Sequence, residues 1–335
     1  MPPIRISMLP YVKDRSVIVD DPKTASLLRN KGAFGRSLPG GGLELSLMEA
    51  AYLISSGRLE VKRSREGHRI SPHELLALGM DARERFLEDY LVFADMRDRG
   101  INIQGDGDRT FLVYPRGKGP GRGKAGSWIK VYREHDDVSI GGLMRETERR
   151  EGMGMELLCA VVDGDWDLTY YSLRRALLSR SRKRTHPGKP DLGEDVLPIP
   201  NGGLLVPDGE VRELLSGMSV GSSISDSLAL SREEAAFLRG EEGDGKTAVY
   251  RDLMERGFVV RTGFKYGTHF RVYTSGSIEE HSDILVHLVE RDAKISWEAL
   301  SRAIRLSHSV RKRMLFASIG KRKRVDYLEI RWTRP

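Results

Sequence analysis

The pattern of apolar and polar residues predicts alternating helices and strands towards the end of the chain. Apolar residues recur at helical spacing in 247–256 and 296–310. Short apolar or alternating runs are typical of strands at 258–262, 269–275, 282–289, 312–319 and 325–332. Helices that flank a mixed sheet form an α/β layer unit. Ahead of this region, "LSREEAAFLRG" has apolar residues at helical spacing behind Ser231, which predicts a helix with a serine N-cap.

The chain repeats itself. The segment "LELSLMEAAYL" at 43–53 matches "LALSREEAAFL" at 228–238. Further on, "DMRDRGINIQGDGDRTFLVYPRG" matches "DLMERGFVVRTGFKYGTHFRVYTSG", and "ELLCAVVDGDWDLTYYSLR" matches "RMLFASIGKRKRVDYLEIRW". The offset between the copies falls from 185 to 157 residues, so the first copy has 28 additional residues around 60–86. Matches in the same order along the chain predict two copies of one unit.

The repeat predicts the fold class and the domain boundaries. We expect an α/β protein of mixed α+β character, in which each copy has a helix-rich N-terminal subdomain followed by a mixed-sheet subdomain. Residues 179–203 are charged and rich in Pro and Gly, as is typical of a linker. The expected parts are 1–88 and 89–178 for the first copy, the linker 179–203, and 204–245 and 246–335 for the second copy.

Composition favours a polyanionic partner and a reducing compartment. The chain has 55 Lys and Arg against 48 Asp and Glu, a net charge of +7. Its one cysteine, Cys159, excludes an internal disulfide framework and a Cys-rich zinc site. The N-terminus lacks the apolar region of a signal peptide, and no stretch of about 18 apolar residues occurs. We therefore expect a soluble, cytoplasmic protein that is not bound to a membrane.

The stretch "GEEGDGKT" at 240–247 satisfies the nucleotide-binding pattern GxxxxGK[ST]. A phosphate-binding loop follows a strand, but a helix is predicted ahead of this stretch. Its three carboxylates would also repel a polyphosphate. We expect a turn between two helices, with Thr247 as the second helix's N-cap and Gly257 just beyond its end, and no nucleotide cofactor.

Three residues could share one end of the predicted sheet. Tyr273 closes a strand, His281 opens the next, and Lys312 opens a later one. A phenol, an imidazole and an ammonium group suit transesterification within RNA, where the 2′-hydroxyl needs a base, the leaving 5′-oxygen an acid, and the phosphorane a cation. Taken singly, a strand tyrosine is usually in the core, a lone histidine structural and a strand-end lysine solvated. The spacing alone leaves both interpretations open.

The strings "VYRDLMERGFVVRTGFKYGTHFRVYTSG", "HSDILVHLV" and "LSRAIRLSHSVRKRMLFASI" resemble the catalytic repeat of the archaeal tRNA-splicing endonucleases. The whole chain resembles the homodimeric form, in which each subunit fuses a degenerate repeat to a catalytic one. The resemblance implies a restriction-endonuclease-like sheet, with Tyr273 as general base, His281 as general acid and Lys312 as electrostatic stabiliser. The implied products are a 2′,3′-cyclic phosphate and a 5′-hydroxyl, without a metal or another cofactor. The loop between Tyr273 and His281 is short for the family, so His287 stays a lesser candidate.

The resemblance also implies how the copies divide the work. The first copy keeps Tyr114, but its histidine position falls near Ser127 and its lysine position on Met155, so this copy is expected to be inactive. Its acidic tip would dock into a basic cleft of the other subunit of a homodimer. The residues of that tip are Asp163, Asp165 and Asp167.

The implied substrate is precursor tRNA with a bulge-helix-bulge. Arg305 and Arg331 would hold a bulged base between their planar groups. The basic run 321–324 would contact phosphates. The basic run 180–184 and the Gly-rich stretch 116–126 are either RNA contacts or solvated segments.

Two other functions remain open on the sequence. A non-catalytic RNA-binding or assembly subunit would lack the three catalytic groups. A metal-dependent DNA nuclease would need clustered carboxylates beside a lysine, for which "RDAK" at 291–294 is the candidate.

Overall fold

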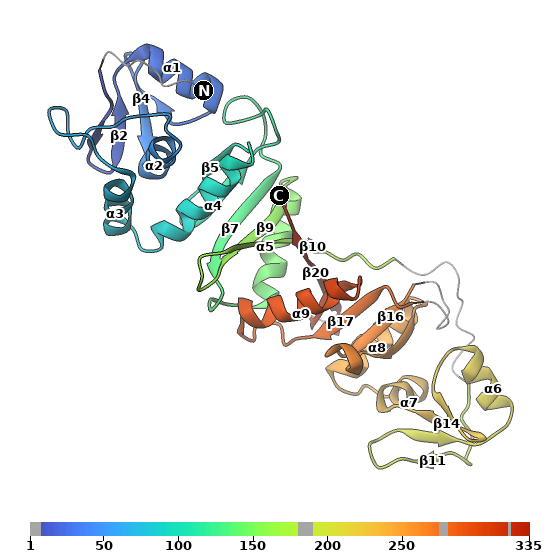
Figure 1. Cartoon of the computed structure of the whole chain (residues 1–335). Helices are drawn as coiled ribbons and strands as arrows, with labels where there is room; N and C mark the ends of the chain where they lie inside the picture. The colour runs from blue at the N-terminus through green and yellow to red at the C-terminus, as the bar shows by residue number, and fades with distance from the viewer. Residues whose placement is uncertain (1–7, 180–189, 275–280, 321–322) are drawn as a thin grey trace. The chain divides into compact units, whose positions relative to one another are not determined.

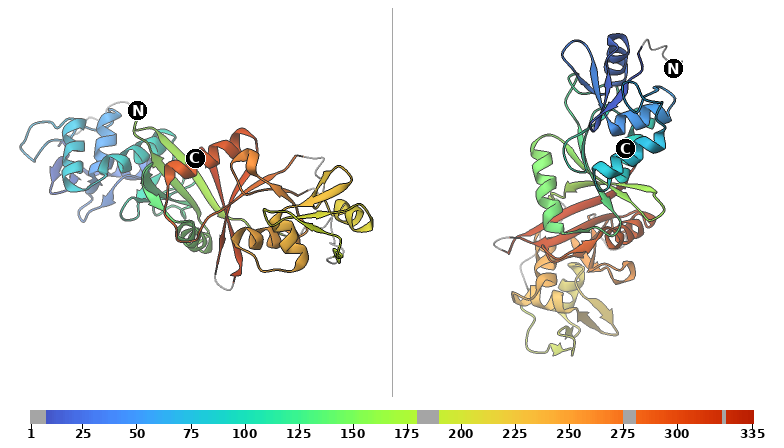
Figure 2. Two further views of the ribbon diagram at one scale, coloured as in Figure 1. Left: turned by 90° about the horizontal axis from the view of Figure 1, so that it is seen from below. Right: turned by 90° about the vertical axis from the view of Figure 1, so that its left-hand side faces the viewer.

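The computed structural model describes residues 8–179, 190–274, 281–320 and 323–335 (Figure 1). It comprises two compact units, each with its own apolar core. Unit 1 contains Met1–Glu134, Met153–Tyr170 and Arg334–Pro335, and unit 2 contains His135–Gly152 and Tyr171–Thr333. Helices and strands alternate in both units (Figure 2), so the expected mixed α/β class is confirmed.

Unit 1 begins with a four-stranded sheet in the order β1-β2-β4-β3. Its strands are β1 Tyr11–Lys13, β2 Ser16–Val19, β3 Arg36–Ser37 and β4 Leu43–Ser46. The helices that follow or interrupt them are α1 Pro22–Gly32, α2 Leu47–Ser55, α3 Pro72–Ala82 and α4 Phe86–Asp98. Sequence analysis predicted a helix-rich subdomain here and missed the sheet, because strands of two to four residues are too short to show an alternation.

The additional segment of the first copy forms α3. Ser71 and Glu74 cap its start reciprocally, each side chain bonding to the other residue's backbone N–H. Gly79 lies against the ring of Phe86, where a Cβ would come within 2.2 Å of a ring carbon. A residue without a side chain therefore lets α3 and the start of α4 pack closely.

The mixed sheet of unit 1 follows α4. Its strands are β5 Ile103–Gly105, β6 Thr110–Val113, β7 Ser127–Arg133, β9 Glu156–Val162 and the start of β10 Leu168–Arg175. The first two neighbouring pairs, β5/β6 and β6/β7, are antiparallel, whereas β7 and β9 are parallel.

Unit 2 repeats this plan. A small sheet has the order β11-β12-β14-β13. It is built from β11 Leu197–Pro198, β12 Leu204–Val206, β13 Ser222–Ile224 and β14 Ser227–Leu230, with α6 Glu210–Gly217 and α7 Arg232–Arg239. Ser231 is the N-cap of α7 as predicted, and Glu234 completes the capping box.

The mixed sheet of unit 2 has the order β15-β16-β17-β19-β20. Its strands are β15 Val259–Thr262, β16 Phe270–Tyr273, β17 Ile284–Leu288, β19 Arg313–Ile319 and β20 Val325–Thr333. The other elements are α8 Gly245–Glu255, the 3-10 turn η1 Phe264–Tyr266, α9 Trp297–Ser309, α5 Ile140–Gly152, and the paired β8 Asp137–Val138 and β18 Ile295–Ser296. Every strand and helix predicted for this region is present, shifted by at most a few residues at its ends.

The two copies agree down to single side-chain contacts. In each, a tyrosine of the last strand donates its hydroxyl proton to an aspartate 2.7 Å away, and an arginine four residues after that aspartate donates to both carboxylate oxygens. The sets are Asp95, Arg99 and Tyr170 in the first copy and Asp252, Arg256 and Tyr327 in the second. This partly buried network supports the predicted duplication.

The stretch 240–247 joins α7 to α8, as predicted, so the element directly before it is a helix and not a strand. The expected cap, however, is wrong. Asp244, not Thr247, is the N-cap of α8, because its carboxylate accepts the backbone N–H of Thr247 over 3.0 Å. That hydrogen bond is the main reason why the pKa of Asp244 is lowered. Gly257 follows the helix with a φ of 82°, as expected of a residue just beyond a helix end.

Candidate active site

Tyr273 and the segment that carries His281 meet at one end of the mixed sheet of unit 2. Tyr273 is the last residue of β16, and its neighbour Val272 pairs with Ile284, the first residue of β17. The N–H of Asp283 donates to the carbonyl of Val272 over 3.1 Å, which extends the pairing by one step. His281 stands two residues before Asp283 and is exposed. Since paired strands lie about 4.8 Å apart, Tyr273 and the entry to β17 are neighbours.

Lys312 lies at the same end, on the next strand of the sheet. β17 and β19 run parallel with Ile284 opposite Arg313, and the N–H of Arg313 donates to the carbonyl of Asp283 over 2.9 Å. Lys312 comes immediately before β19, so it stands beside Asp283. The strand order therefore puts Tyr273 and Lys312 on either side of the entry to β17.

The turn after α9 fixes Lys312. Arg311 adopts a left-handed conformation with φ 55°, and the N–H of Lys312 then donates to the carbonyl of Ser307 over 2.9 Å. The half-buried Lys312 ammonium donates to the carbonyl of Ser282 and lies 5.6 Å from the centre of the Tyr266 ring. Both contacts hold the positive charge at the sheet end.

Two further residues arrange the strand ends, and sequence analysis missed both. The Arg271 guanidinium lies 5.8 Å from the ring centre of the buried Tyr273. The Asp283 carboxylate accepts the N–H of Thr274 over 3.1 Å and also the Thr274 hydroxyl. Asp283 thus ties the chain just after Tyr273 to the start of β17. Residues 275–280 lie outside the described part of the chain.

A cationic hollow of about 650 Å³ opens beside Lys312. Arg331 lines it, as does Trp332, whose ring is 40% exposed and meets His308 edge-on at 4.9 Å between ring centres. Arg305 does not line the hollow, but it is exposed on α9 one turn before His308. The hollow is lined by Ile304, Ser307, His308, Ser309, Arg311, Lys312, Arg313, Met314, Ile330, Arg331 and Trp332.

Glu329 anchors the basic residues around this hollow, and nothing in the sequence pattern marks it. It is fully buried and accepts hydrogen bonds from Arg313 at 2.8 and 3.1 Å and from Arg174 at 2.8 Å. Arg331 lies 3.7 Å away. Burial by itself raises the pKa of Glu329, but the two arginines outweigh it and hold that pKa below its ordinary value. Glu329 is therefore a buried anion among three cations.

His287 does not belong to this sheet end. It pairs in register with Phe316, well inside β19, and its ring lies 4.6 Å from that of His269. Burial lowers the pKa of His287, and burial together with the charge of a protonated His287 and of Lys246 lowers the pKa of His269 to about 4. The lesser candidate for the acid is thus placed away from Tyr273 and Lys312.

The same sheet end in the first copy has different side chains. In the second copy, Ile284 pairs with Val272 on one side and with Arg313 on the other. In the first copy, Ser127 takes the place of Ile284, since it pairs with Val113 on one side and with Glu156 on the other. Counted from these pairs, the lysine position falls on Met155 as predicted, and the histidine position falls on Lys124, three residues before the expected Ser127. Tyr114 corresponds to Tyr273 in the first copy. It is buried, and its hydroxyl donates to the side-chain oxygen of Gln104 over 3.0 Å.

The acidic tip of the first copy lies between β9 and β10. Asp165 and Asp167 are exposed, whereas one carboxylate oxygen of Asp163 accepts the N–H groups of both, at 3.1 and 2.9 Å. Trp166 stands between them with φ 66° and is 50% exposed. Asp163 therefore shapes the turn, and the other two carboxylates face outward.

The remaining sequence candidates are separate from this site. In "RDAK", Asp292 is exposed in a turn after β17, and Arg291 pairs with Asp326 at 2.8 Å. Lys323 pairs with Glu242 at 2.6 Å. The run 180–184 and residues 321–322 lie outside the described residues. Within the described ranges, no three His, Cys, Asp or Glu side chains are grouped to hold a metal ion, and no helix is long and apolar enough to cross a membrane.

Comparison with known proteins agrees with the duplicated architecture. The tRNA intron endonuclease catalytic C-terminal domain matches residues 86–170 and again 244–327, and the N-terminal domain of that family matches residues 8–76. The tRNA-splicing endonuclease of Methanococcoides burtonii is 32% identical over 95% of this chain and 97% of its own length. Those of Methanosarcina mazei and Haloferax volcanii are 33% and 30% identical over 90% and 89% of this chain and 92% and 91% of their own. This chain therefore belongs to the tRNA intron endonuclease family.

Proposed function

We propose that this protein excises introns from precursor tRNA by cutting at bulge-helix-bulge junctions. The observation that carries the proposal is the sheet end of unit 2, where Tyr273 and Lys312 flank the start of β17, three residues after His281. A cationic hollow adjoins it. Positive charge beside a general acid and base suits cleavage of a phosphodiester.

The reaction that fits these groups is an internal transesterification. Tyr273, as the phenolate, accepts the proton of the 2′-hydroxyl, whose oxygen then bonds to the adjacent phosphorus. The bond from phosphorus to the 5′-oxygen breaks, and His281 gives that oxygen a proton. Lys312 stabilises the negative charge of the phosphorane between these steps. The products are a 2′,3′-cyclic phosphate and a 5′-hydroxyl, and no metal takes part.

Recognition of a bulged base is assigned to the groups around the hollow. Arg331 lies in the hollow, and Arg305 is exposed on the helix that borders it. Planar guanidinium groups stack on unstacked bases, and the exposed ring of Trp332 offers a further planar surface. The first copy would contribute no second cutting site, because Lys124 and Met155 occupy the positions of the acid and the cation.

The first copy would instead hold the dimer together. The outward Asp165 and Asp167 flank the exposed Trp166, and an aromatic side chain among charges is typical of an interface anchor. We assign this tip to a basic surface of a second copy of the chain, giving a homodimer with two catalytic copies.

The test is cleavage of a transcribed intron-containing precursor tRNA in excess EDTA. Wild type should release the intron with cyclic-phosphate ends. His281→Ala and Lys312→Ala should each slow single-turnover cleavage by a factor of about 100 or more. His73→Ala removes an exposed histidine of unit 1 and should cut like wild type.

Three outcomes would refute the proposal. Cleavage that needs magnesium would contradict the metal-free chemistry and favour a nuclease that uses carboxylates. Equal rates for wild type and His281→Ala would remove His281 from the mechanism. If wild type binds the RNA tightly but does not cut it, the chain is a binding or assembly subunit.

A further inference from the structure

The first copy has a basic loop where the second copy has its catalytic groups. The loop, residues 115–126, joins β6 to β7, as the segment with His281 joins β16 to β17. It begins directly after Tyr114, and Lys124 takes the position of His281. The sequence of the loop, "PRGKGPGRGKAG", has four cations and no acidic residue. The degenerate active site has therefore lost its acid but keeps a concentration of positive charge.

The structure holds this loop in a defined place on unit 1. The guanidinium of Arg122 donates to the backbone carbonyl and the side-chain oxygen of Asn30, at 2.7 and 2.9 Å. The side-chain amide of Asn102 donates to the carbonyl of Lys118 over 2.5 Å. Gly119 is buried against Ala33, where an added Cβ would lie 2.9 Å from the alanine Cβ. These contacts fix the loop on the C-terminal end of α1.

The other three cations of the loop remain available to a ligand. Arg116, Lys118 and Lys124 are exposed, and none of them forms an ion pair with a residue in the described ranges. Exposed cations grouped on one loop attract a polyanion. The three bonds from Arg122 and Asn102 and the packing of Gly119 thus maintain an arrangement that favours a polyanion.

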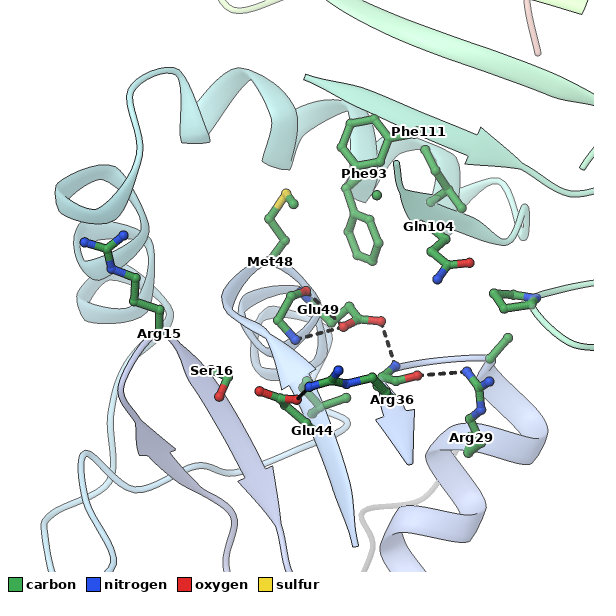
Figure 3. A pocket seen from close by; sticks show the side chains of 17 residues that line it. Arg15, Ser16, Arg29, Arg36, Glu44, Met48, Glu49, Phe93, Gln104 and Phe111 are labelled. Atoms are coloured by element: carbon green, nitrogen blue, oxygen red, sulfur yellow. Dashed lines mark hydrogen bonds and ion pairs between the residues drawn. The ribbon is translucent and has the colours of Figure 1, made fainter. Parts of the chain in front are cut away.

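The positive surface continues into a hollow of about 390 Å³ that Pro120 of the loop also lines (Figure 3). Arg15, Arg29 and Arg36 project into or border it, with the apolar Met48 and Phe93 in its wall. Arg36 is paired with Glu44 at 2.6 Å, and Arg29 donates to the carbonyl of Gly35 over 2.8 Å. Arg15 is exposed and has no ion pair among the described residues.

Two carboxylates also line this hollow, Glu44 and Glu49. Glu44 pairs with Arg36, and Glu49 accepts the N–H of Gly35 at 2.7 Å and that of Ser46, so three arginines stand against two carboxylates. Arg15 and Arg29 therefore extend the basic surface of the loop.

We propose that loop 115–126, together with Arg15 and Arg29, is a second RNA-binding surface that binds the phosphate backbone of the precursor tRNA. The inference rests on the proposed function, because it takes RNA to be the substrate. Phosphate contacts supply affinity without reading sequence, which suits long cationic side chains between glycines. The duplicated catalytic end thus cuts in one copy and binds in the other.

The experiment measures binding of precursor tRNA to the full chain carrying His281→Ala, so that the RNA stays intact. In that background Arg116, Lys118 and Lys124 are changed to Gln together, which leaves the structural contacts of Arg122 in place. The matched control changes Lys23, Arg63 and Arg149 to Gln, three exposed cations that do not line the hollow. A charge-preserving variant exchanges Lys for Arg and Arg for Lys at the three loop positions.

The loop variant should bind precursor tRNA roughly tenfold or more weakly near 0.1 M salt. The slope of log affinity against log salt concentration should also become shallower, by about two to three. The control and the charge-preserving variant should bind like the background protein. In otherwise wild-type protein, the loop change should leave the single-turnover rate at saturating enzyme unaltered.

Equal affinity and equal salt slope for the loop variant and the control would overturn the inference, while cleavage by wild type would still support the proposed function. A lower single-turnover rate with unchanged affinity would also overturn it, since it would place the loop in the chemistry and not in binding. Failure of wild type to cleave at all refutes the proposed function separately. Far-ultraviolet circular dichroism of each variant establishes that it is folded.

Discussion

Replacing Glu329 by Gln should destabilise unit 2 far more than the loss of an exposed ion pair would. The side chain keeps its shape but loses the charge that Arg313 and Arg174 share. Breaking a buried ion pair costs about 3 to 5 kcal/mol because the partner charges are left uncompensated. The two arginines are 39% and 53% exposed, so water takes over part of the solvation. We therefore expect the lower end, about 3 kcal/mol in the free energy of unfolding near pH 7.

The dependence on pH identifies the charge as the cause. The pKa of Glu329 is lower in the folded chain than in the unfolded chain. Its stabilisation is therefore fully present above the unfolded pKa and is lost as the pH falls through the folded pKa. The difference between wild type and the variant should shrink towards zero in acid, when the carboxyl group of wild type is itself protonated.

The assay is urea unfolding of both proteins near pH 7 and at about pH 3, followed by far-ultraviolet circular dichroism. Glu44→Gln serves as the control, because Glu44 pairs with Arg36, which is 81% exposed, and an exposed pair contributes less than about 1 kcal/mol. A loss below about 1 kcal/mol for Glu329→Gln near pH 7 would refute the reasoning. So would a larger loss that is the same at both pH values.

Two further predictions concern the dimer and acid stability. Changing Asp165 and Asp167 to Lys should raise the dissociation constant of the proposed dimer by about tenfold or more, as measured by light scattering over a dilution series. The control Asp226→Lys should leave that constant unchanged. Equal dissociation constants for the two variants would exclude the tip from the interface. His287→Phe should reduce the loss of stability on acidification. Burial lowers the pKa of His287 on folding, and the charge of His287 is the second cause, after burial, of the lowered pKa of His269. The unfolded chain therefore binds these protons first, and stability declines as the pH drops below the ordinary pKa of histidine. A chemical-denaturation series from pH 7 to about pH 4 that shows the same decline in the variant would contradict this role.

Part of the fold could be predicted because its signals are local. The helix at α9 and the strands at β16, β17, β19 and β20 have apolar runs of the right period, and Ser231 with Glu234 is a capping signal within one turn. The error at α8 is equally local. Asp244 and Thr247 are both good caps, and the choice between them depends on which side chain reaches a free N–H, which the conformation of the Gly-rich turn decides.

The candidate catalytic residues were found by their positions at strand ends and by resemblance, whereas their supports were not. Nothing in the sequence marks Asp283 as the residue that joins Thr274 to β17, since exposed aspartates near turns are common. The hydrogen bond from Lys312 to Ser282 spans 30 residues and depends on the parallel pairing of β17 with β19.

The sequence by itself determined that the chain is duplicated, that the last part of each copy is a mixed sheet, and that only the second copy has Tyr, His and Lys at corresponding strand ends. These features follow from the period of the apolar residues, the order of the matched segments and the spacing of the candidate residues along the chain. Only the tertiary structure decided that Glu329 is an anion buried among arginines, that Trp332 lies in the hollow with Lys312, and that the Gly-rich loop is fixed on α1. Such contacts join residues far apart in the sequence, and burial, which sets their strength, exists only once the chain has packed.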